Sequence, residues 1–269
     1  MSINSINTNT AAMFTQNQMI QNTSASARTN QQLSSGQRIN SAADDAAGLA
    51  IGNKLNSQLR GMEQAIRNTN DGISMMQVAG GSLSQANDIV QRMRELTLQS
   101  SSGIMNDSDR GAIDKEYNQL LDQLETIQQG TSFNGLNLFG QGNELSLQIG
   151  EKAGDILGVS LQSFDVEALR NAGADPAARL NALDGTLESI NSTQADIGAI
   201  SNRLESSANT LANNIQNTVE ASSRIADTDY AKALSERSAQ QIREQVQIAL
   251  LGQANAQPKQ VLRLLGGSG

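Results

Sequence analysis

The chain has 269 residues and a formal net charge of −8, and 38% of its residues are hydrophobic but only 2% are aromatic. So few aromatic side chains disfavour a thick globular core and favour long helices that each bury a narrow stripe. The acidic balance disfavours nucleic acid and anionic membranes as partners, and the absence of histidine and cysteine removes the commonest residues of catalytic and metal sites, so we expect no cofactor and no enzymatic activity.

The first predicted element is a weak helix over residues 3–33. Ile6, Met13 and Ile20 recur at a seven-residue spacing, but the segment is otherwise polar and has too little apolar surface to fold unaided. The first residues lack the basic and apolar regions of a secretory signal, and no run of about 18 apolar residues is present to insert into a membrane.

A linker over residues 33–50 follows, and it leads into a second helix over residues 55–100. Asp44–Asp45 are expected in the first turn of this helix, where the helix dipole favours negative charge. Gly72 and Gly80–Gly81 interrupt the apolar stripe of the helix, which predicts a bend or a close approach of another segment to the backbone there.

A turn over residues 101–109 precedes a third helix, in which apolar residues alternate at spacings of four and three over residues 113–127. The pattern then changes. Residues 132–161 alternate in polarity around residue 147 and are rich in Gly and Asn, which predicts short strands and turns where the chain turns back. Residues 164–175 are ambiguous between a loop and a short helix.

The strongest periodicity lies between residues 183 and 225. Apolar side chains recur there with heptad spacing over about six repeats without a proline, which predicts one long helix. Asp175 before Pro176 is a typical helix start. The seam consists of Leu183, Ile190, Ile197, Leu204, Leu211, Ile215 and Ile225. It is narrow and contains polar positions, so the helix needs partner helices of similar length.

A second linker over residues 225–229 leads to a last weak helix, predicted from residue 230 to about 265. The side chains that we expect to take part in contacts on this helix are Ile242, Val246, Ala249, Leu262, Leu264 and Leu265. The order of elements is therefore symmetric about the turn-back. We predict a mainly α fold: a long antiparallel helical bundle or coiled coil over residues 41–229, with a small β-hairpin region, and paired terminal helices from residues 1–40 and 230–269.

Several segments resemble the terminal signatures of bacterial flagellins. They are LSSGQRINSAADDAAGLAI at 33–51, NTNDGIS at 68–74, TSFNGL at 131–136, DTDYA at 227–231, ALLGQAN at 249–255 and VLRLL at 261–265. The similarity extends over nearly the whole chain and is densest at both ends. The chain differs from many flagellins in lacking a long variable insertion at the turn-back, and in the Gly266–Gly269 tail, where the family usually ends near the last leucines.

This resemblance implies a structural subunit that polymerises with itself into the extracellular flagellar filament and serves swimming motility. It also implies export of the unfolded chain through the flagellar type III apparatus, with the terminal helices forming the inner layer of the filament. The implied partners are an export chaperone, the filament cap protein and the hook-associated junction proteins.

The resemblance further implies recognition by innate immune receptors of a host. The patch read by a Toll-like receptor in the family corresponds to Arg92, Leu96 and Glu116, and the C-terminal leucines resemble a segment sensed by a cytosolic receptor. The simpler interpretation is that these residues only pack within the filament.

Two alternatives to a filament subunit remain at this point: a hook–filament junction protein of the same superfamily, and a secreted helical effector. Electron microscopy after seeding would separate them.

Overall fold

The computed structural model describes residues 8–140 and 144–266. The chain divides into two compact units, one made of residues 1–57 and 218–269 and the other of residues 58–217. The long helices α2 (Ala46–Ser100) and α5 (Pro176–Ala226) each contribute to both units. The prediction of a mainly α fold with small β-hairpins is confirmed.

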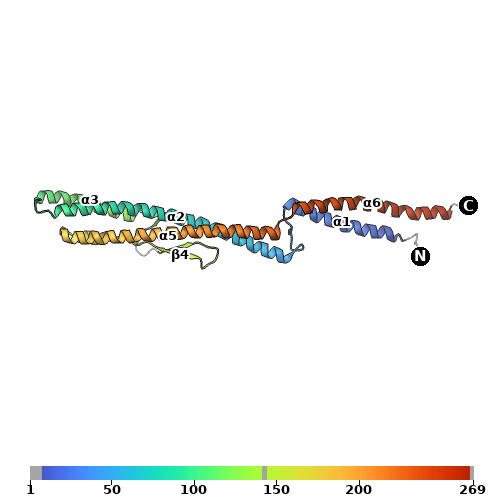
Figure 1. The fold of residues 1–269 in the computed structure, drawn as a ribbon, viewed down its shortest axis with the longest axis horizontal. Coiled ribbons are helices and arrows are strands. Elements are labelled where there is room, and N and C mark those ends of the chain that lie inside the picture. Colours follow the sequence, from blue (N-terminus) through green and yellow to red (C-terminus); the bar gives the residue numbers. More distant parts are fainter. Residues whose placement is uncertain (1–7, 141–143, 267–269) are drawn as a thin grey trace. The chain divides into compact units, whose positions relative to one another are not determined.

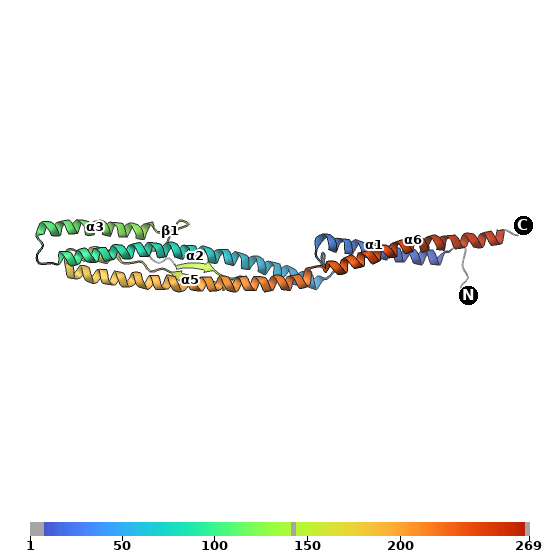
Figure 2. The same ribbon diagram turned by 45° about the horizontal axis from the view of Figure 1, so that its top comes forward.

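In the unit of residues 58–217, α2, α3 (Asp107–Gly130) and α5 lie side by side, and α5 runs antiparallel to α2 (Figures 1 and 2). α5 begins as the sequence predicts, with Pro176 in the first position and the carboxylate of Asp175 accepting a hydrogen bond of 3.2 Å from the N–H of Ala177. The ambiguous segment after residue 164 contains a short helix, α4 (Val166–Asn171).

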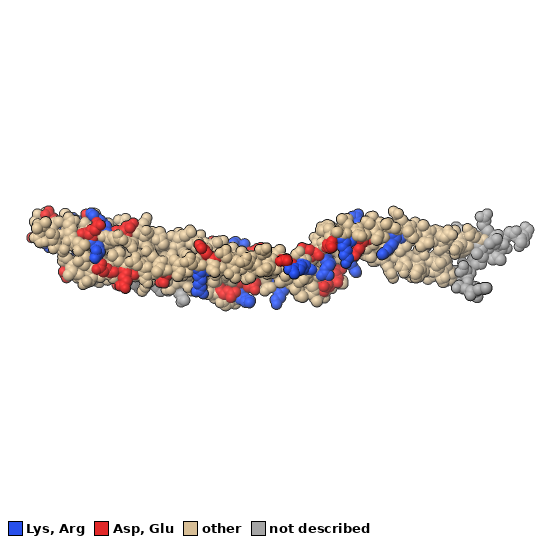
Figure 3. Space-filling model, in the orientation of Figure 1, with Lys and Arg blue, Asp and Glu red and all other residues tan. Residues whose placement is uncertain are grey.

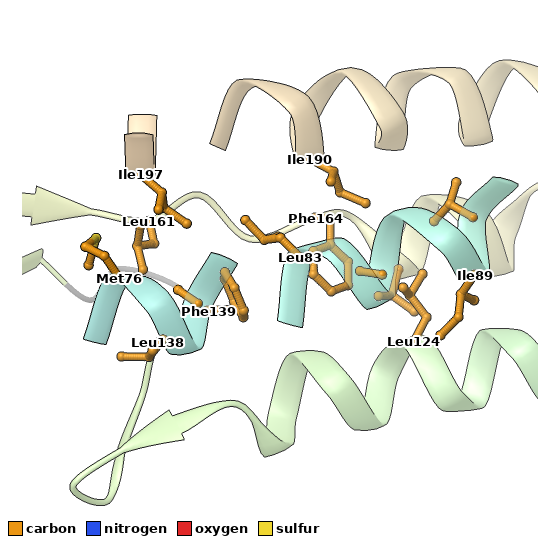
Figure 4. Packing of buried hydrophobic residues seen from close by; sticks show 14 of the residues in the cluster. Met76, Leu83, Ile89, Leu124, Leu138, Phe139, Leu161, Phe164, Ile190 and Ile197 are labelled. Carbon is orange, nitrogen blue, oxygen red and sulfur yellow. The ribbon is translucent and has the colours of Figure 1, made fainter. Parts of the chain in front are cut away.

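The core of this unit is formed where α2 and α5 meet side chains from α3 and from the turn-back segment (Figure 4). Every seventh residue of α5 from Leu183 to Leu204 belongs to this core, and Leu211 packs in a smaller cluster with Met62 and Ala65. Ile215 and Ile225 are only half-buried. The rings of Phe139 and Phe164, with centroids 5.9 Å apart, supply aromatic bulk beneath the turn-back.

The turn-back contains two antiparallel hairpins, β1 (Ser132–Phe133) with β2 (Leu136–Asn137), and β3 (Glu144–Gln148) with β4 (Ile156–Ser160). The first hairpin turns at Asn134 and Gly135, which have φ angles of 49° and 80°. Both values lie in the left-handed region that a tight two-residue hairpin turn requires, and Asn-Gly is the residue pair that adopts it most readily.

The glycines of α2 do not interrupt the helix, which is continuous from residue 46 to residue 100. The predicted close approach is found at Gly72, where a Cβ atom would lie 2.9 Å from Leu147 Cδ1 and 3.3 Å from Leu204 Cδ1. At Gly81 a Cβ would meet no atom within 4 Å. Gly72 therefore allows the β3 hairpin and α5 to pack directly against the backbone of α2.

In the other unit, α1 (Thr10–Ser35) and α6 (Tyr230–Gly266) pair antiparallel (Figures 1 and 2). The segments that follow α1 and precede α6 are hydrogen-bonded to each other through an isolated bridge between Gln37 and Asp227. Arg38 adds two hydrogen bonds of 2.6 Å: its N–H donates to the carbonyl of Ala226 and its guanidinium to that of Ile225. Arg38 therefore satisfies the last carbonyls of α5.

The prediction for Asp44–Asp45 was wrong in position, because α2 begins at Ala46 and both residues precede it. Asp45 acts as a cap, since its carboxylate accepts a hydrogen bond of 2.8 Å from the N–H of Gly48. Asp44 instead closes the preceding turn, where its hydrogen bond with the Ser41 hydroxyl holds the pKa of its carboxyl below the usual value. A cap satisfies the free N–H groups more directly than charge in the first turn does.

Candidate functional site

The fully buried side chains described between α1 and α6 are polar or small. The buried side chains on α1 are Asn22 and Thr29, and those on α6 are Ala233, Gln240 and Ala254. Gln240 donates a hydrogen bond of 3.1 Å to the Thr29 hydroxyl, and Asn22 donates one of 3.0 Å to the backbone carbonyl of Gln240. Little apolar area is buried between the two helices, so the pair is held mainly by hydrogen bonds.

Most of the large apolar side chains described on both helices point outward, while Met19, Leu33 and Leu251 are half-buried. Met13 is 56% exposed, Ile20 64% and Ile242 62%, and the other exposed members are Phe14, Leu234, Val246, Ile248 and Leu250. We call these eight residues the terminal apolar face. Ala249 is also exposed. Ile6 lies outside the described residues; Leu262, Leu264 and Leu265 belong to the α6 backbone, but their side chains lie outside the description.

Charge is absent from much of this pair. The sequence has no Asp, Glu, Lys or Arg from residue 1 to 27 or from residue 245 to 258. Figure 3 accordingly shows the described part of α1 and α6 towards the chain ends in tan, without the blue of Lys and Arg or the red of Asp and Glu. Six of the eight residues of the terminal apolar face lie in these uncharged stretches, while Leu234 and Ile242 have charged neighbours in the sequence. An exposed apolar surface with so little charge is unusual in a monomeric protein and indicates a surface that another protein covers.

A second surface lies on α2 and α3, where Arg92 forms ion pairs of 2.9 Å with Glu116 and 3.1 Å with Glu95. The hydrogen bond to Glu116 raises the pKa of the Arg92 guanidinium above its usual value, so the charge is retained. Both side chains of the Arg92–Glu116 pair are about half-exposed. Leu96, by contrast, is only 2% exposed, so it is not available for direct contact with a partner.

Arg179 was not singled out by the sequence, although it is buried at the start of α5. Its guanidinium donates hydrogen bonds of 2.6 Å to Asp114 and 2.5 Å to the carbonyl of Gly173, and it lies 4.2 Å from the centre of the Tyr117 ring. Burial raises the pKa of the Tyr117 hydroxyl, which has no hydrogen-bond partner. Only the fold brings these residues together, because no local motif links residues 114 and 179.

Neither surface has the composition of a catalytic or metal site. Within residues 8–140 and 144–266, no group of three or more acidic side chains is placed to hold a metal ion. No helix in the described part of the chain is both long and apolar enough to span a membrane.

Comparison with known proteins identifies the family. Residues 6–144 match the bacterial flagellin N-terminal helical region, and residues 180–265 match the bacterial flagellin C-terminal helical region. A flagellin of Halalkalibacterium halodurans is 38% identical over 97% of this chain and 99% of its own length. The chain belongs to the bacterial flagellin family.

Other relatives agree with this assignment. The flagellin of Bacillus subtilis is 37% identical over 97% of this flagellin and 99% of its own length, and a flagellar filament core protein of Treponema maltophilum is 36% identical over the same shares. A structure from Vibrio parahaemolyticus described as a flagellar hook-associated protein has a TM-score of 0.60, covering 68% of this chain and all of its own, but is only 16% identical, so it supports the fold alone.

As a flagellin, the chain is a structural subunit of the flagellar filament and not an enzyme. Flagellins polymerise with themselves, and the filament that they form is extracellular. The hook–filament junction protein and the soluble effector are not favoured, because the relatives matched over nearly their full length are flagellins and filament core proteins.

Proposed function

We propose that this flagellin joins its neighbours through the terminal apolar face, and that residues 1–40 and 230–269 form the inner layer of the filament. The support is the exposure of Met13, Ile20 and Ile242 on helices whose mutual contact is polar. The chain offers no cover for these side chains among its described residues. The occupant that fits best is a second copy, because it brings the same apolar side chains and the same uncharged stretches of α1 and α6.

The energetics favour folding coupled to assembly. Covering one large apolar side chain contributes about 1.5–3 kcal/mol, so the eight residues of the terminal apolar face supply on the order of 10–20 kcal/mol per subunit once buried. Ordering the backbone costs about 1–2 kcal/mol per residue, and the isolated α1–α6 pair buries too little apolar area to offset this cost securely. Contacts between subunits therefore supply much of the stability of the terminal helices.

Seeded polymerisation of Ile242→Asp tests this proposal, with Ile104→Asp as a matched control. Both changes place a carboxylate at an exposed isoleucine, and Ile104 is 94% exposed in the turn between α2 and α3. At Ile242 the charge would be desolvated on assembly, which is costly for an unpaired carboxylate. We expect Ile242→Asp to abolish filament growth while Ile104→Asp grows, and both soluble chains to melt like the unsubstituted chain. Normal growth of Ile242→Asp would refute the assembly surface.

We further propose that the exported chain depends on partners that cover the same face before and during assembly. A chaperone in the cytoplasm, the filament cap and the hook-associated junction proteins would each need an apolar surface complementary to α1 and α6, since an uncovered apolar face of this size promotes aggregation. Co-purification of the flagellar export chaperone with the Ile242→Asp chain, compared with the Ile104→Asp chain, tests the first of these. Equal recovery would place the chaperone elsewhere.

We also propose that host recognition involves Arg92 and Glu116, because they form a half-exposed charged pair that joins α2 to α3. Leu96 would act beneath them, by packing α2 against the core. Binding of a Toll-like receptor ectodomain to Arg92→Ala tests this, with Arg94→Ala as control. Arg94 lies on the same helix but pairs with Asp184 of α5 at 2.9 Å. We expect a loss of affinity of about tenfold for Arg92→Ala alone. Equal losses would exclude a specific role for Arg92.

A further inference from the structure

The helix α6 contains a proline well inside its length. Pro258 lies 28 residues after Tyr230, the first residue of α6, and eight residues before Gly266, the last. Proline has no backbone N–H, so the carbonyl four residues earlier, that of Ala254, loses the donor that an α-helix normally supplies. Ala254 is 8% exposed, which limits access of water to this carbonyl. A buried carbonyl of this kind needs a donor from elsewhere in the protein.

Asn9 of the opposite helix supplies that donor. Its Nδ2 atom donates a hydrogen bond of 2.8 Å to the carbonyl oxygen of Ala254. The Oδ1 atom of the same side chain accepts a hydrogen bond of 3.0 Å from the N–H of Ala12, which makes Asn9 the N-cap of α1. One amide group therefore caps α1 and completes the hydrogen bonding of α6.

The contact belongs to a series with a single register. Asn22 donates to the carbonyl of Gln240 at 3.0 Å, and the Tyr230 hydroxyl donates to the carbonyl of Leu33 at 3.1 Å. Along α1 from residue 9 to 22 and then 33, the partner on α6 moves from 254 to 240 and then 230. This near one-to-one relation means that a rigid shift of α1 along α6 would break these three contacts together.

The inward side chains that repeat every seven residues select this register only weakly. The inward side chains of α6 recur every seven residues as Ala233, Gln240, Gln247 and Ala254, all of which are buried or half-buried. They are small or amide-bearing, so a shift of α1 by one heptad, about 10 Å along the axis, would bring similar side chains together. What the shift would lose is the donor to the Ala254 carbonyl. Buried polar contacts of this kind are known to fix the register of helix pairs.

We propose that Asn9 and Pro258 act together to determine the register in which α1 pairs with α6. Pro258 creates an acceptor at one position of α6, and Asn9 is the group that fills it. The inference concerns pairing within one chain and does not depend on the assembly surface proposed above. In a filament, it specifies which outward side chains of α1 and α6 lie next to each other on the terminal apolar face.

Disulfide trapping tests the register, because the chain has no cysteine of its own. Thr15→Cys with Ala254→Cys reports the observed register, since these positions lie two heptads along each helix from the hydrogen-bonded pair Thr29 and Gln240. This pair leaves the Ala254 carbonyl intact. Thr15→Cys with Gln240→Cys reports a shift of one heptad, because Gln240 contacts Asn22 and Thr29 in the observed register. The two partner positions are about 20 Å apart along α6, which exceeds the span of a disulfide, so the two reporters exclude each other. Non-reducing gels separate the internally bridged chain from dimers, in the soluble protein and after polymerisation.

In the unsubstituted background we expect the 15–254 bridge to form at least about fivefold faster than the 15–240 bridge, the ratio expected from one hydrogen bond of ordinary net strength. Asn9→Ser keeps a good cap residue but cannot reach Ala254, and should reduce this ratio towards one. Pro258→Ala restores the helix donor, and should also reduce it. Adding Asn9→Ser to Pro258→Ala should then change nothing further. Asn17→Ser, at an exposed position of α1, should leave the ratio unaltered.

The proposal is overturned if both reporters form equally in the unsubstituted background, because no register is then selected. It is also overturned if Asn9→Ser lowers the ratio by the same factor in the presence and in the absence of Pro258→Ala, because Asn9 then acts independently of the proline. If the substituted chains no longer polymerise, the soluble chain still gives the ratio.

Discussion

Replacing Leu204 by alanine should destabilise the unit of residues 58–217 more than most single substitutions would. Leu204 is fully buried, and its Cδ atoms lie opposite Gly72, where α2 provides no side chain. No neighbour across α2 can extend into the space that is vacated, so the cavity should persist. Buried Leu→Ala changes cost about 2–5 kcal/mol, and a cavity that cannot collapse places the cost in the upper half of that range.

For a unit of this size, a loss of about 3–5 kcal/mol corresponds to a decrease in Tm of roughly 6–20 °C. Differential scanning calorimetry of Leu204→Ala beside Glu205→Ala measures it, since Glu205 is the exposed neighbour. A second substitution tests the cause. Gly72→Ala should destabilise the unsubstituted chain by crowding Leu147 and Leu204, but should cost less in Leu204→Ala, where the vacated space receives the new methyl group and lets the end of the Leu147 side chain move aside. Equal Tm shifts for Leu204→Ala and Glu205→Ala, or a purely additive effect of Gly72→Ala, would refute this reasoning.

Three further outcomes are expected. Brief proteolysis of the dilute monomer should remove residues 1–40 and 230–269 and leave a fragment of about 45–225, because the α1–α6 pair buries little apolar area; mass spectrometry showing protected termini would contradict this. Burial raises the pKa of Tyr117 above its unfolded value of about 10, so its contribution to stability is present below pH 10 and decreases as the pH rises beyond it; urea unfolding from pH 8 to 11 should show a steeper loss for the unsubstituted chain than for Tyr117→Phe. Arg179→Met should cost about 1–3 kcal/mol, since Asp114 and the carbonyl of Gly173 both lose their donor; an unchanged midpoint in the same urea assay would show that water replaces the guanidinium.

The elements that depend on repeated local patterns could be predicted from the sequence. The heptad spacing after Leu183 identifies the buried stripe of α5, and Asp175–Pro176 identifies its start. The strands within 132–161 could also be predicted, because alternating polar and apolar residues flanked by Gly and Asn favour a β-strand over a helix. Gly72 was expected to permit a close approach, and Leu147 and Leu204 make that approach.

Features that depend on distant residues could not be predicted. Apolar residues on α1 drew attention to Met13 and Ile20, whereas the face towards α6 contains Asn22 and Thr29. The seven-residue spacing of Asn22 and Thr29, two polar residues on a helix, was a usable signal for that inner face. The role of Arg179 has no such signal, because Asp114 becomes its partner only after α3 and α5 have packed. For Leu96 the sequence resemblance gives a place in a recognition patch but not the exposure of the side chain. Only the fold shows that Leu96 is buried.

The lack of charge at the chain ends determines how the contacts of the terminal helices depend on pH and salt concentration. No side chain from residue 8 to 27 or from residue 245 to 258 can gain or lose a proton in water, and none carries a charge that salt could screen (Figure 3). Contacts made through these stretches should therefore keep their strength from acid to alkaline media, and added salt should not weaken them. A response of the protein to acidity must arise elsewhere, at groups such as Asp44 and Tyr117, and salt screening must act on ion pairs such as that of Arg92 and Glu116.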